Sequence, residues 1–280
     1  NARCFSSISV DTECGLLTKT STKVQKLEDE AFWYVHLPEE LKIFTPRLVS
    51  FDKDKSSASL TQELYGYPSL QELYLSGEVN LEDWNYIIKS LFSLHKKFEK
   101  FKGETNPDAI KWLYYDKTKE RLSDLRAQNP YWNEVLDREF EYINGKKYRG
   151  IASLKSGIDI YVQKLCKTGK ETVIHGDYCF SNILFDSSNY NFKLVDPRGR
   201  LNNEPTIYGD PRYDIAKLRH SIAGFYDFIV HGLFRLKENK TGFEYEIKTS
   251  VDYSILEMIF NKYAELNGYH INPTRTFAQP

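Results

Sequence analysis

The chain has 280 residues, enough for one large domain or two lobes around a sizeable core. Hydrophobic residues make up 41% and charged residues 28%, which is ordinary for a globular protein. With 38 basic and 39 acidic residues the formal net charge is -1, which argues against a nucleic-acid-binding surface and a polybasic membrane patch. No apolar run reaches the length of a membrane span, so we expect no membrane insertion. Four irregularly spaced cysteines predict the reduced thiols of a cytoplasmic protein.

The sequence pattern of residues 1–66 predicts a small β-rich lobe. Period-two alternation in CFSSISV and GLLTKT, separated by the turn-like DTECG, predicts two strands within residues 1–22. A helical stripe of apolar residues follows from Val24 to Leu37 and ends at Pro38. RLVSFD and SASLTQEL then predict two more strands, joined by the polar turn KDKSS.

Residues 67–280 predict a larger, mainly helical lobe, so the expected fold class is α+β and bilobal. Asn80 is the predicted N-cap of a helix that runs to about Phe98. NILFD and FKLVD predict a β-hairpin across the loop SSNYN. Further helices are expected at 107–127, at 152–166 and from Asp210-Pro211 onward.

The segment VIHGDYCFSNILFD, residues 173–186, contains Asp177 and Asn182 at the spacing D-x-x-x-x-N. Kinase-type loops place a catalytic base and an asparagine metal ligand at this spacing, and an aspartate metal ligand follows the next hairpin. Asp196, in KLVDPRG, ends that hairpin here. An ionised carboxylate can receive a hydroxyl proton, and amide and carboxylate oxygens suit Mg²⁺. The alternative is a turn pair that satisfies backbone groups. We expect His175 to support the loop backbone.

HGDYCFSNILFD, KLVDPRG and GDPRYDIAKL together resemble the aminoglycoside phosphotransferase and choline kinase family of small-molecule kinases. The resemblance is strong at residues 173–219 and extends loosely over most of the chain. It implies a protein-kinase-like fold, ATP as donor, Mg²⁺ and a small-molecule hydroxyl acceptor. It also implies Asp177 as catalytic base, Asn182 and Asp196 as Mg²⁺ ligands, and Asp214 as a brace for the catalytic loop.

The resemblance also indicates which residues bind the nucleotide phosphates. Lys19, in GLLTKTS, has the strand position of the phosphate-binding lysine, and Lys23 and Lys26 are nearby alternatives. Its expected partner is Glu30, in EAFWYVHL. Helical-wheel geometry favours Glu28 instead, because Glu28 lies nearer the apolar stripe.

QELYGYPSLQEL resembles the hinge of these kinases, where backbone groups of Glu63, Leu64 and Tyr65 would meet the adenine edge. An ordinary connection from strand to helix is compatible with the same sequence. The N-terminal turn departs from the kinase pattern, because it has no G-x-G-x-x-G motif and Gly15 stands alone. Backbone or hydroxyl groups would have to cover the phosphates, and the serines of this region are Ser6, Ser7 and Ser9.

Asp196 is followed by Pro-Arg rather than the Phe-Gly of protein kinases, which argues against a protein substrate. Arg198 and Arg200 add positive charge beside the predicted metal site. They belong either to a solvated loop or to a site for an anionic acceptor. A choline-type acceptor would instead be bound by carboxylates and aromatic rings. We expect Arg198 to act beside Asp177, contacting the acceptor or the transferred phosphoryl group.

An ATP-dependent phosphotransferase, with a sugar or polyol as acceptor, is the leading hypothesis. A nucleotide-binding scaffold without transfer activity is the alternative. The complete set of Asp177, Asn182 and Asp196 argues against it, and the missing glycine-rich loop keeps it open. A metal-dependent hydrolase using His175 and Asp177 is a third class. It would need further histidines, and no metal-type spacing is found at His36, His95, His220, His231 and His270.

Overall fold

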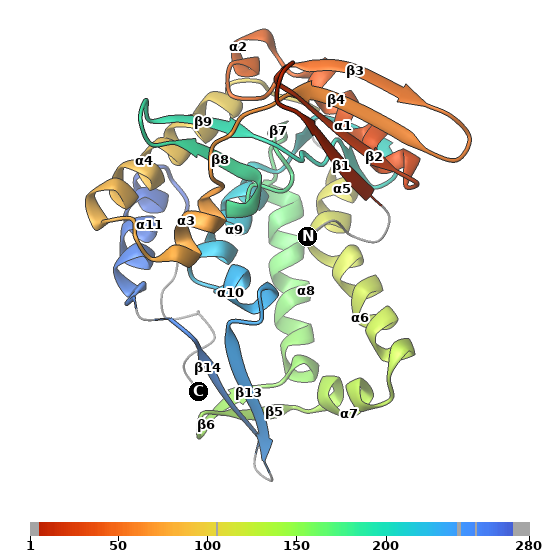
Figure 1. Ribbon diagram of the computed structural model, residues 1–280. Helices are drawn as coiled ribbons and strands as arrows, with labels where there is room; N and C mark the ends of the chain where they lie inside the picture. The colour runs from red at the N-terminus through yellow and green to blue at the C-terminus, as the bar shows by residue number, and fades with distance from the viewer. Residues whose placement is uncertain (1–5, 105, 240–241, 250, 271–280) are drawn as a thin grey trace.

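The structure is a computed structural model that describes residues 6–104, 106–239, 242–249 and 251–270. It begins with a four-stranded antiparallel sheet in the order β1-β2-β4-β3, drawn at the top of Figure 1. The predicted order of strand, strand, helix, strand, strand is confirmed, although the start of the first predicted strand lies outside the described residues. The elements are β1 (Ser6–Asp11), β2 (Leu16–Ser21), α1 (Val24–His36), α2 (Glu39–Lys42), β3 (Leu48–Lys53) and β4 (Ala58–Glu63).

Helix α1 and the sheet share one hydrophobic cluster. Along β4, Ala58, Leu60 and Gln62 are buried and alternate with half-buried residues, as expected for a strand with one covered face. On α1, Ala31 and Tyr34 are three residues apart, lie on one face, and join Leu60 in the cluster. The period-two and helical patterns therefore fix which face of each element is covered.

The rest of the chain is mainly helical, which confirms the α+β fold class. The N-caps predicted from sequence are present: Asn80 accepts a hydrogen bond from the Asp83 N–H at 2.9 Å, and Asp210 accepts one from the Arg212 N–H at 3.0 Å. The helices are α3 (Leu70–Ser76), α4 (Leu81–Phe98), α5 (Pro107–Lys111), the π-helix η1 (Trp112–Asp116), α6 (Lys117–Gln128), α7 (Tyr131–Asp137), α8 (Ile151–Thr168), α9 (Pro211–Ile222), α10 (Tyr226–Val230) and α11 (Ser254–Leu266).

Short strands between α8 and α9 flank the loop of residues 174–182, which contains Asp177 and Asn182 and is called the motif loop below. The predicted hairpin is confirmed as β8 (Ile183–Asp186) and β9 (Asn191–Leu194), and a 3-10 turn, η2 (Phe180–Asn182), precedes it. The remaining strands of this region are β7 (Thr172–Val173) with β12 (Tyr208–Gly209), and β10 (Arg200–Leu201) with β11 (Glu204–Pro205).

The mainly helical part also contains a second four-stranded sheet that the sequence pattern did not predict. Its order is β13-β14-β5-β6, and it lies at the bottom of Figure 1. The turn between β5 and β6 is Asn144-Gly145, and both residues have positive φ, which is typical of a tight hairpin. The strands are β5 (Phe140–Ile143), β6 (Lys146–Arg149), β13 (Phe234–Asn239) and β14 (Gly242–Ile247).

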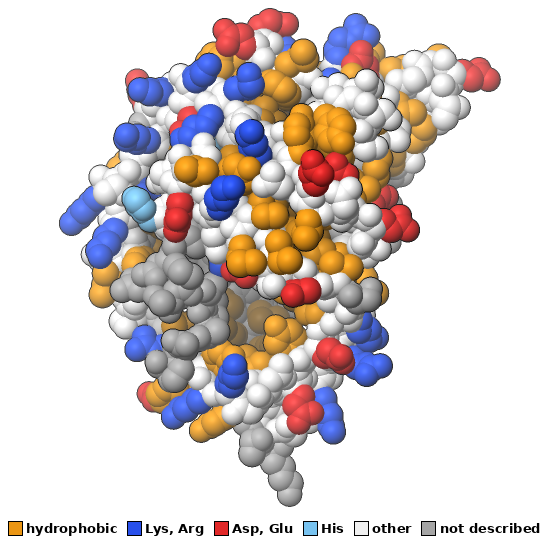
Figure 2. Space-filling view, turned by 90° about the vertical axis from the view of Figure 1, so that its left-hand side faces the viewer, with side chains coloured by type: hydrophobic (Ala, Val, Ile, Leu, Met, Phe, Trp, Pro, Cys, Tyr) orange, Lys and Arg blue, Asp and Glu red, His pale blue; other side chains and the backbone are white. Residues whose placement is uncertain are grey.

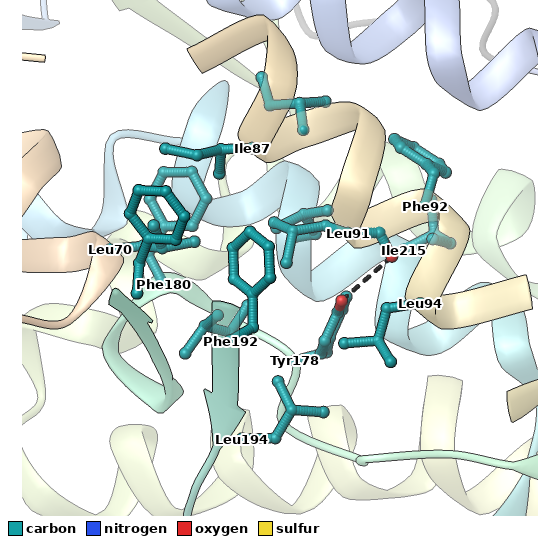
Figure 3. Packing of buried hydrophobic residues seen from close by; sticks show 14 of the residues in the cluster. Leu70, Ile87, Leu91, Phe92, Leu94, Tyr178, Phe180, Phe192, Leu194 and Ile215 are labelled. Carbon is teal, nitrogen blue, oxygen red and sulfur yellow. Dashed lines mark hydrogen bonds between the residues drawn. The ribbon is translucent and has the colours of Figure 1, made fainter. Parts of the chain in front are cut away.

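The hydrophobic core reaches directly under the motif loop. Tyr178 and Phe180 follow Asp177 in sequence and are fully buried among residues of α4 and β9 (Figure 3). The Tyr178 hydroxyl donates to the Leu91 carbonyl oxygen of α4 at 3.1 Å. Because these aromatic side chains lie in close-packed surroundings, the loop backbone between them has little freedom to move.

The surface on the left-hand side of Figure 1 carries mixed side chains. Figure 2 shows this face, with a hydrophobic patch near its middle and lysine and arginine side chains mainly above and to the left. Acidic side chains are interspersed with them. Among the helices of the described residues, none has the length and apolar character needed to cross a membrane.

The segment after Asp196 lies directly against α1, and we predict that this contact is important for stability. Gly199 has φ +64°, and a Cβ atom there would lie 1.8 Å from the Asp29 carbonyl oxygen. Gly199→Ala should lower the free energy of unfolding by about 3 kcal/mol or more, since the left-handed conformation costs about 1–2 kcal/mol and the backbone must also move. Chemical denaturation measures this.

Gly145→Ala is the matched control. Gly145 also has positive φ, +75°, but a Cβ atom there would meet none of the described neighbouring residues within 4 Å. Gly145→Ala should lower the free energy of unfolding only by the cost of the left-handed conformation, about 1–2 kcal/mol. Equal losses in the two variants would show that the approach of Gly199 to α1 is unimportant.

Candidate active site

Lys19 on β2 is the centre of a partly buried ion cluster. Its Nζ lies 2.7 Å from Oε1 of Glu30, a buried residue of α1, and also donates to Oδ1 of Asp196. Burial opposes the charge of Lys19, but the negative charges of Glu30 and Asp196 outweigh it and raise the pKa of Lys19. Burial raises the pKa of Asp196, but Lys19 and Lys26 outweigh it and the net pKa is lowered. Both groups are therefore ionised at neutral pH.

The alternative residues for this cluster, Glu28, Lys23 and Lys26, do not lie at its centre. Glu28 pairs with Lys53 on β3, at the edge strand of the sheet. Lys26 is 3.9 Å from Oδ2 of Asp196 and is more exposed than Lys19. Lys23 is the residue before α1 and lines the adjacent cavity. Among these lysines, Lys19 is the one in contact with both carboxylates.

A cavity of about 510 Å³ opens beside this cluster, a volume within the range of small-molecule sites. Its wall combines apolar side chains from the sheet and from β8 with the charged cluster and with Asn182. Ser7 is the serine of the N-terminal turn region that lines it. The lining residues are Ser7, Ile8, Leu17, Lys19, Ser21, Lys23, Lys26, Leu27, Glu30, Pro46, Gln62, Glu63, Tyr65, Ser181, Asn182, Leu184, Val195 and Asp196.

The predicted hinge residues differ in their relation to this cavity. Glu63 and Tyr65 line it, and the Tyr65 hydroxyl donates to the Glu63 carboxylate at 3.1 Å. Leu64 is not part of the cavity wall, and its N–H donates to the carbonyl oxygen of Gly15 at 2.8 Å. The N–H of Leu64 is therefore already engaged within the chain.

Asp177 and Asn182, the last residue of the turn η2, are hydrogen-bonded to each other. The Asn182 side-chain N–H group donates to the Asp177 carbonyl oxygen at 2.9 Å and to its Oδ2 at 3.2 Å. Oδ1 of Asn182 therefore faces away from Asp177, towards the Ser181 hydroxyl at 3.2 Å. Oδ1 of Asp177 lies 2.7 Å from Lys217 Nζ. Burial raises the pKa of Asp177, but Lys217 outweighs it, and the lowered net pKa leaves the carboxylate ionised.

Asp214 holds the loop backbone from within α9. Its fully buried carboxylate accepts the N–H of His175 at 2.7 Å and that of Gly176 at 2.8 Å. The indole N–H of Trp33 donates to the preceding Ile174 carbonyl oxygen at 2.7 Å, so α1 supports the same loop backbone. The His175 ring is fully buried and accepts the Asp177 N–H at 3.3 Å, and burial lowers its pKa. His175 is therefore a neutral supporting residue.

The backbone turns sharply at Asp196. Its φ is 58°, a left-handed conformation that is costly for a residue with a side chain. The next turn is fixed by the Arg198 N–H, which donates to the His175 carbonyl oxygen at 2.9 Å. The carboxylate of Asp196 lies at the cavity wall.

Arg198 and Arg200 have different surroundings. Arg200 donates to both carboxylate oxygens of Asp29, at 2.8 and 2.9 Å, and so joins β10 to α1. Arg198 donates through Nε to the Gly176 carbonyl oxygen at 2.9 Å and through Nη2 to the Tyr213 hydroxyl at 3.3 Å. Arg200 thus forms a structural ion pair, whereas Arg198 lies against the motif loop beside Asp177.

Lys217, Tyr213 and Lys117 are site residues that the sequence reasoning missed. Lys217 follows Asp214 by three residues on α9, so helical periodicity could have put both on the side of the helix that faces the loop. Lys117 follows the π-helix η1 and donates to the Tyr213 hydroxyl at 3.2 Å. A π-helix has no clear sequence signal, and the 107–127 stretch had the pattern of an ordinary helix.

No protein-family model matches the chain, and no curated protein matches it. Solved structures do. An aminoglycoside-3'-phosphotransferase of type VIII is 17% identical, with 92% of this chain and 80% of that chain covered and a TM-score of 0.49. A thermostable mutant of aminoglycoside phosphotransferase APH(4)-Ia, in a ternary complex with AMP-PNP and hygromycin B, is 12% identical, with coverages of 77% and 68% and a TM-score of 0.48.

A third similar structure is the bifunctional kinase-methyltransferase WbdD, which is 11% identical, with 95% of this chain and 43% of that chain covered and a TM-score of 0.36. The chain thus spans less than half the length of WbdD. These similar structures include the aminoglycoside phosphotransferases that the sequence motifs resemble. Identities this low leave the function to be decided by the chemistry of the site.

We predict that Asp214 is essential for the stability of the motif loop. Asp214→Ala leaves the buried N–H groups of His175 and Gly176 without their acceptor, at a cost of about 1–3 kcal/mol each. Burial raises the pKa of Asp214, so removing this carboxylate offsets part of that cost. The free energy of unfolding should fall by about 2–4 kcal/mol in urea denaturation.

Asp252→Ala is the comparison variant. This exposed carboxylate accepts one N–H, that of Ser254, at 2.9 Å. Its loss should cost about 1 kcal/mol or less. If Asp214→Ala is no more destabilising than Asp252→Ala, Asp214 does not support the loop.

Proposed function

We propose that this protein is an ATP-dependent phosphotransferase that moves the γ-phosphoryl group to a hydroxyl of a small molecule. The observation that supports this proposal most strongly is the contact of three charged groups from separate elements of the chain. Lys19 of β2, Glu30 of α1 and Asp196 after β9 are in contact, and Asn182 lines the same cavity and is hydrogen-bonded to Asp177. Phosphoryl transfer needs a cation for the phosphates, oxygen ligands for Mg²⁺ and a base for the acceptor.

In this proposal, ATP occupies the cavity beside Lys19. The protonated ammonium of Lys19 attracts the phosphates, and the buried Glu30 carboxylate holds it in position. Ile8, Leu17 and Leu184 provide the apolar wall on which a purine packs. Glu63 and Tyr65 supply polar groups at the same wall.

The residues at the cavity fit a magnesium ion. Asn182 contributes a carbonyl oxygen whose direction is set by the hydrogen bonds of its N–H group, and Asp196 contributes an ionised carboxylate. Mg²⁺ commonly takes one or two protein ligands and completes its shell with phosphate and water oxygens. Bound Mg²⁺ supplies positive charge that neutralises the phosphate oxygens.

Asp177 has the properties of the base. Its carboxylate is ionised and 38% exposed, so a hydroxyl can reach it. Its position is fixed by Asn182 and by the backbone bonds to Asp214. A carboxylate held in this way can orient the acceptor hydroxyl and receive its proton as the phosphoryl group is transferred.

The two alternative functions differ from this one at identifiable residues. A nucleotide-binding scaffold would need the cavity and Lys19 but not Asp177. A metal-dependent hydrolase would need a cluster of strong ligands. Within the part of the chain that the structure describes, no three His, Cys, Asp or Glu side chains form a group able to hold a metal ion. The site therefore supports transfer over metal-dependent hydrolysis.

We predict that Asp177→Asn loses transfer and keeps the nucleotide. The amide cannot accept the hydroxyl proton, so turnover should fall by roughly 10²–10⁴-fold, while ATP affinity stays close to the parent value. ADP release is measured with ATP, Mg²⁺ and a panel of sugars and polyols, and binding is measured by calorimetry. Unchanged turnover in a folded Asp177→Asn protein would falsify the assignment of the base.

We also predict that Asn182→Ala and Asp196→Ala each weaken binding of the Mg²⁺-nucleotide complex. Each substitution removes an oxygen ligand from an ion that accepts few substitutes. Titration with AMP-PNP, with and without Mg²⁺, measures the effect. Asn189→Ala, in the turn of the same hairpin, is the control and should bind as the parent does. Parent-like binding by both site variants would mean that the metal lies elsewhere.

A further inference from the structure

A second group of cations lies on the other side of Asp177 from Asn182. The Tyr213 hydroxyl receives hydrogen bonds from Lys117 Nζ at 3.2 Å and from Arg198 Nη2 at 3.3 Å. Lys217 is 2.7 Å from Asp177. We call Lys117, Arg198 and Lys217 the cation cluster. None of the three lines the nucleotide cavity, so the cluster is separate from the phosphate-binding Lys19.

The positive charge of this cluster is balanced only in part, by Asp177. Lys217 is paired with Asp177, but within the described ranges neither Lys117 nor Arg198 forms an ion pair with a carboxylate. The pKa of Lys117 is lowered to about 7. Burial is the main cause, followed by the positive charges of Arg198, Arg121 and Lys217. Gathering like charges in a partly buried place costs free energy, which a bound anion would recover.

The cluster is also held rigidly. Arg198 Nε donates to the Gly176 carbonyl oxygen at 2.9 Å, next to Asp177 in sequence. The Tyr213 ring lies under both cations, 5.5 Å from the Arg198 guanidinium and 5.6 Å from Lys117 Nζ. The Trp112 ring is 5.8 Å from Lys117 Nζ. These contacts reduce the entropy that would be lost when an anion is bound.

The π-helix η1 contributes to the position of Lys117. It runs from Trp112 to Asp116 and ends directly before Lys117 at the start of α6. A π-helix turn is less favourable than an α-helical one and is found often at functional sites. Here Trp112 is the first residue of η1 and Lys117 follows its last, and the Lys117 ammonium lies over the Trp112 ring.

We propose that Lys117 and Arg198 bind an anionic group of the acceptor, a phosphate or a carboxylate, while the acceptor hydroxyl lies at Asp177. This inference rests on the proposed phosphotransferase function and adds the chemical class of the acceptor. The planar guanidinium of Arg198 offers paired N–H donors that match either anion, and Lys117 adds a point charge. An acceptor with ammonium groups would face Arg198, Lys217 and a partly protonated Lys117 against one carboxylate, and would be repelled.

The test compares matched acceptors that differ in charge. Each pair contains a hydroxyl compound and its anionic counterpart: glycerol with glycerol 3-phosphate and with glycerate, and a hexose with its 6-phosphate. ADP release is followed with ATP and Mg²⁺ for the parent, Lys117→Met and Arg198→Ala. Lys119→Met is the matched control, since it removes the same charge from an exposed position of the same helix.

The parent should have a higher kcat/KM for the anionic member of a pair. Lys117→Met and Arg198→Ala should each lower that kcat/KM by roughly tenfold to a hundredfold, the scale of a lost hydrogen bond to a charged group. The loss of kcat/KM should be larger for the anionic member of each pair than for the neutral member, and the KM for ATP should change little. Lys119→Met should behave as the parent. A purely structural role of Lys117 would instead lower activity with every acceptor alike.

The outcomes separate this inference from the proposed function. A parent that prefers neutral or cationic acceptors overturns the inference and leaves the phosphotransferase function in place. Absence of Asp177-dependent ADP release with every acceptor argues against the phosphotransferase function. Calorimetric titration with the same anionic compounds, without ATP, then decides the anion site by itself. Binding that Lys117→Met weakens and Lys119→Met does not supports the site, and absence of such binding overturns it.

Discussion

The contact of Lys19 with Glu30 and Asp196 is the interaction on which the rest of the site depends. A lysine at this depth is stable as a cation only because both carboxylates are present, and Glu30 in turn would be an uncompensated buried group without Lys19. The three residues come from β2, α1 and the segment after β9, so the charges meet only when these parts are assembled. Further contacts strengthen the same junction: Arg200 with Asp29, and Trp33 with the Ile174 carbonyl oxygen.

Asp177 is the point where two differently charged regions meet. Through Asn182 it is connected to the cavity beside Lys19, where in our proposal a metal ion and Lys19 face the nucleotide phosphates. Through Lys217 it is connected to the cation cluster, which in our inference faces the acceptor. Asp214 holds the backbone between the two regions from a fully buried position. The proposed chemistry therefore needs a rigid loop, and the buried aromatic residues after Asp177 supply that rigidity.

Local patterns in the sequence predicted the local structure well. The helix expected at Val24–Leu37 is present as Val24–His36, and the N-caps Asn80 and Asp210 are where the side-chain chemistry indicated. The second sheet was missed for two reasons. The Asn144-Gly145 turn is a local hairpin signal that was overlooked. The pairing of β14 with β5 through the Phe243–Ile143 register joins residues about a hundred positions apart, and a single sequence carries no signal for such pairing. Glu28 was favoured by the apolar stripe of α1, but a buried ion pair follows the position of its partner charge and not hydrophobicity. The lobe boundary at residue 66 and the roles of the site residues remain predictions.

The most direct test is to locate the metal and the nucleotide together. A crystal structure of the protein with AMP-PNP and Mn²⁺ in place of Mg²⁺ would do so, because anomalous scattering from Mn²⁺ identifies the metal position. We predict Mn²⁺ bound to Oδ1 of Asn182 and to the Asp196 carboxylate, with the nucleotide phosphates at Lys19. A nucleotide bound outside the cavity, or a metal ion held by other residues, would contradict the proposed function.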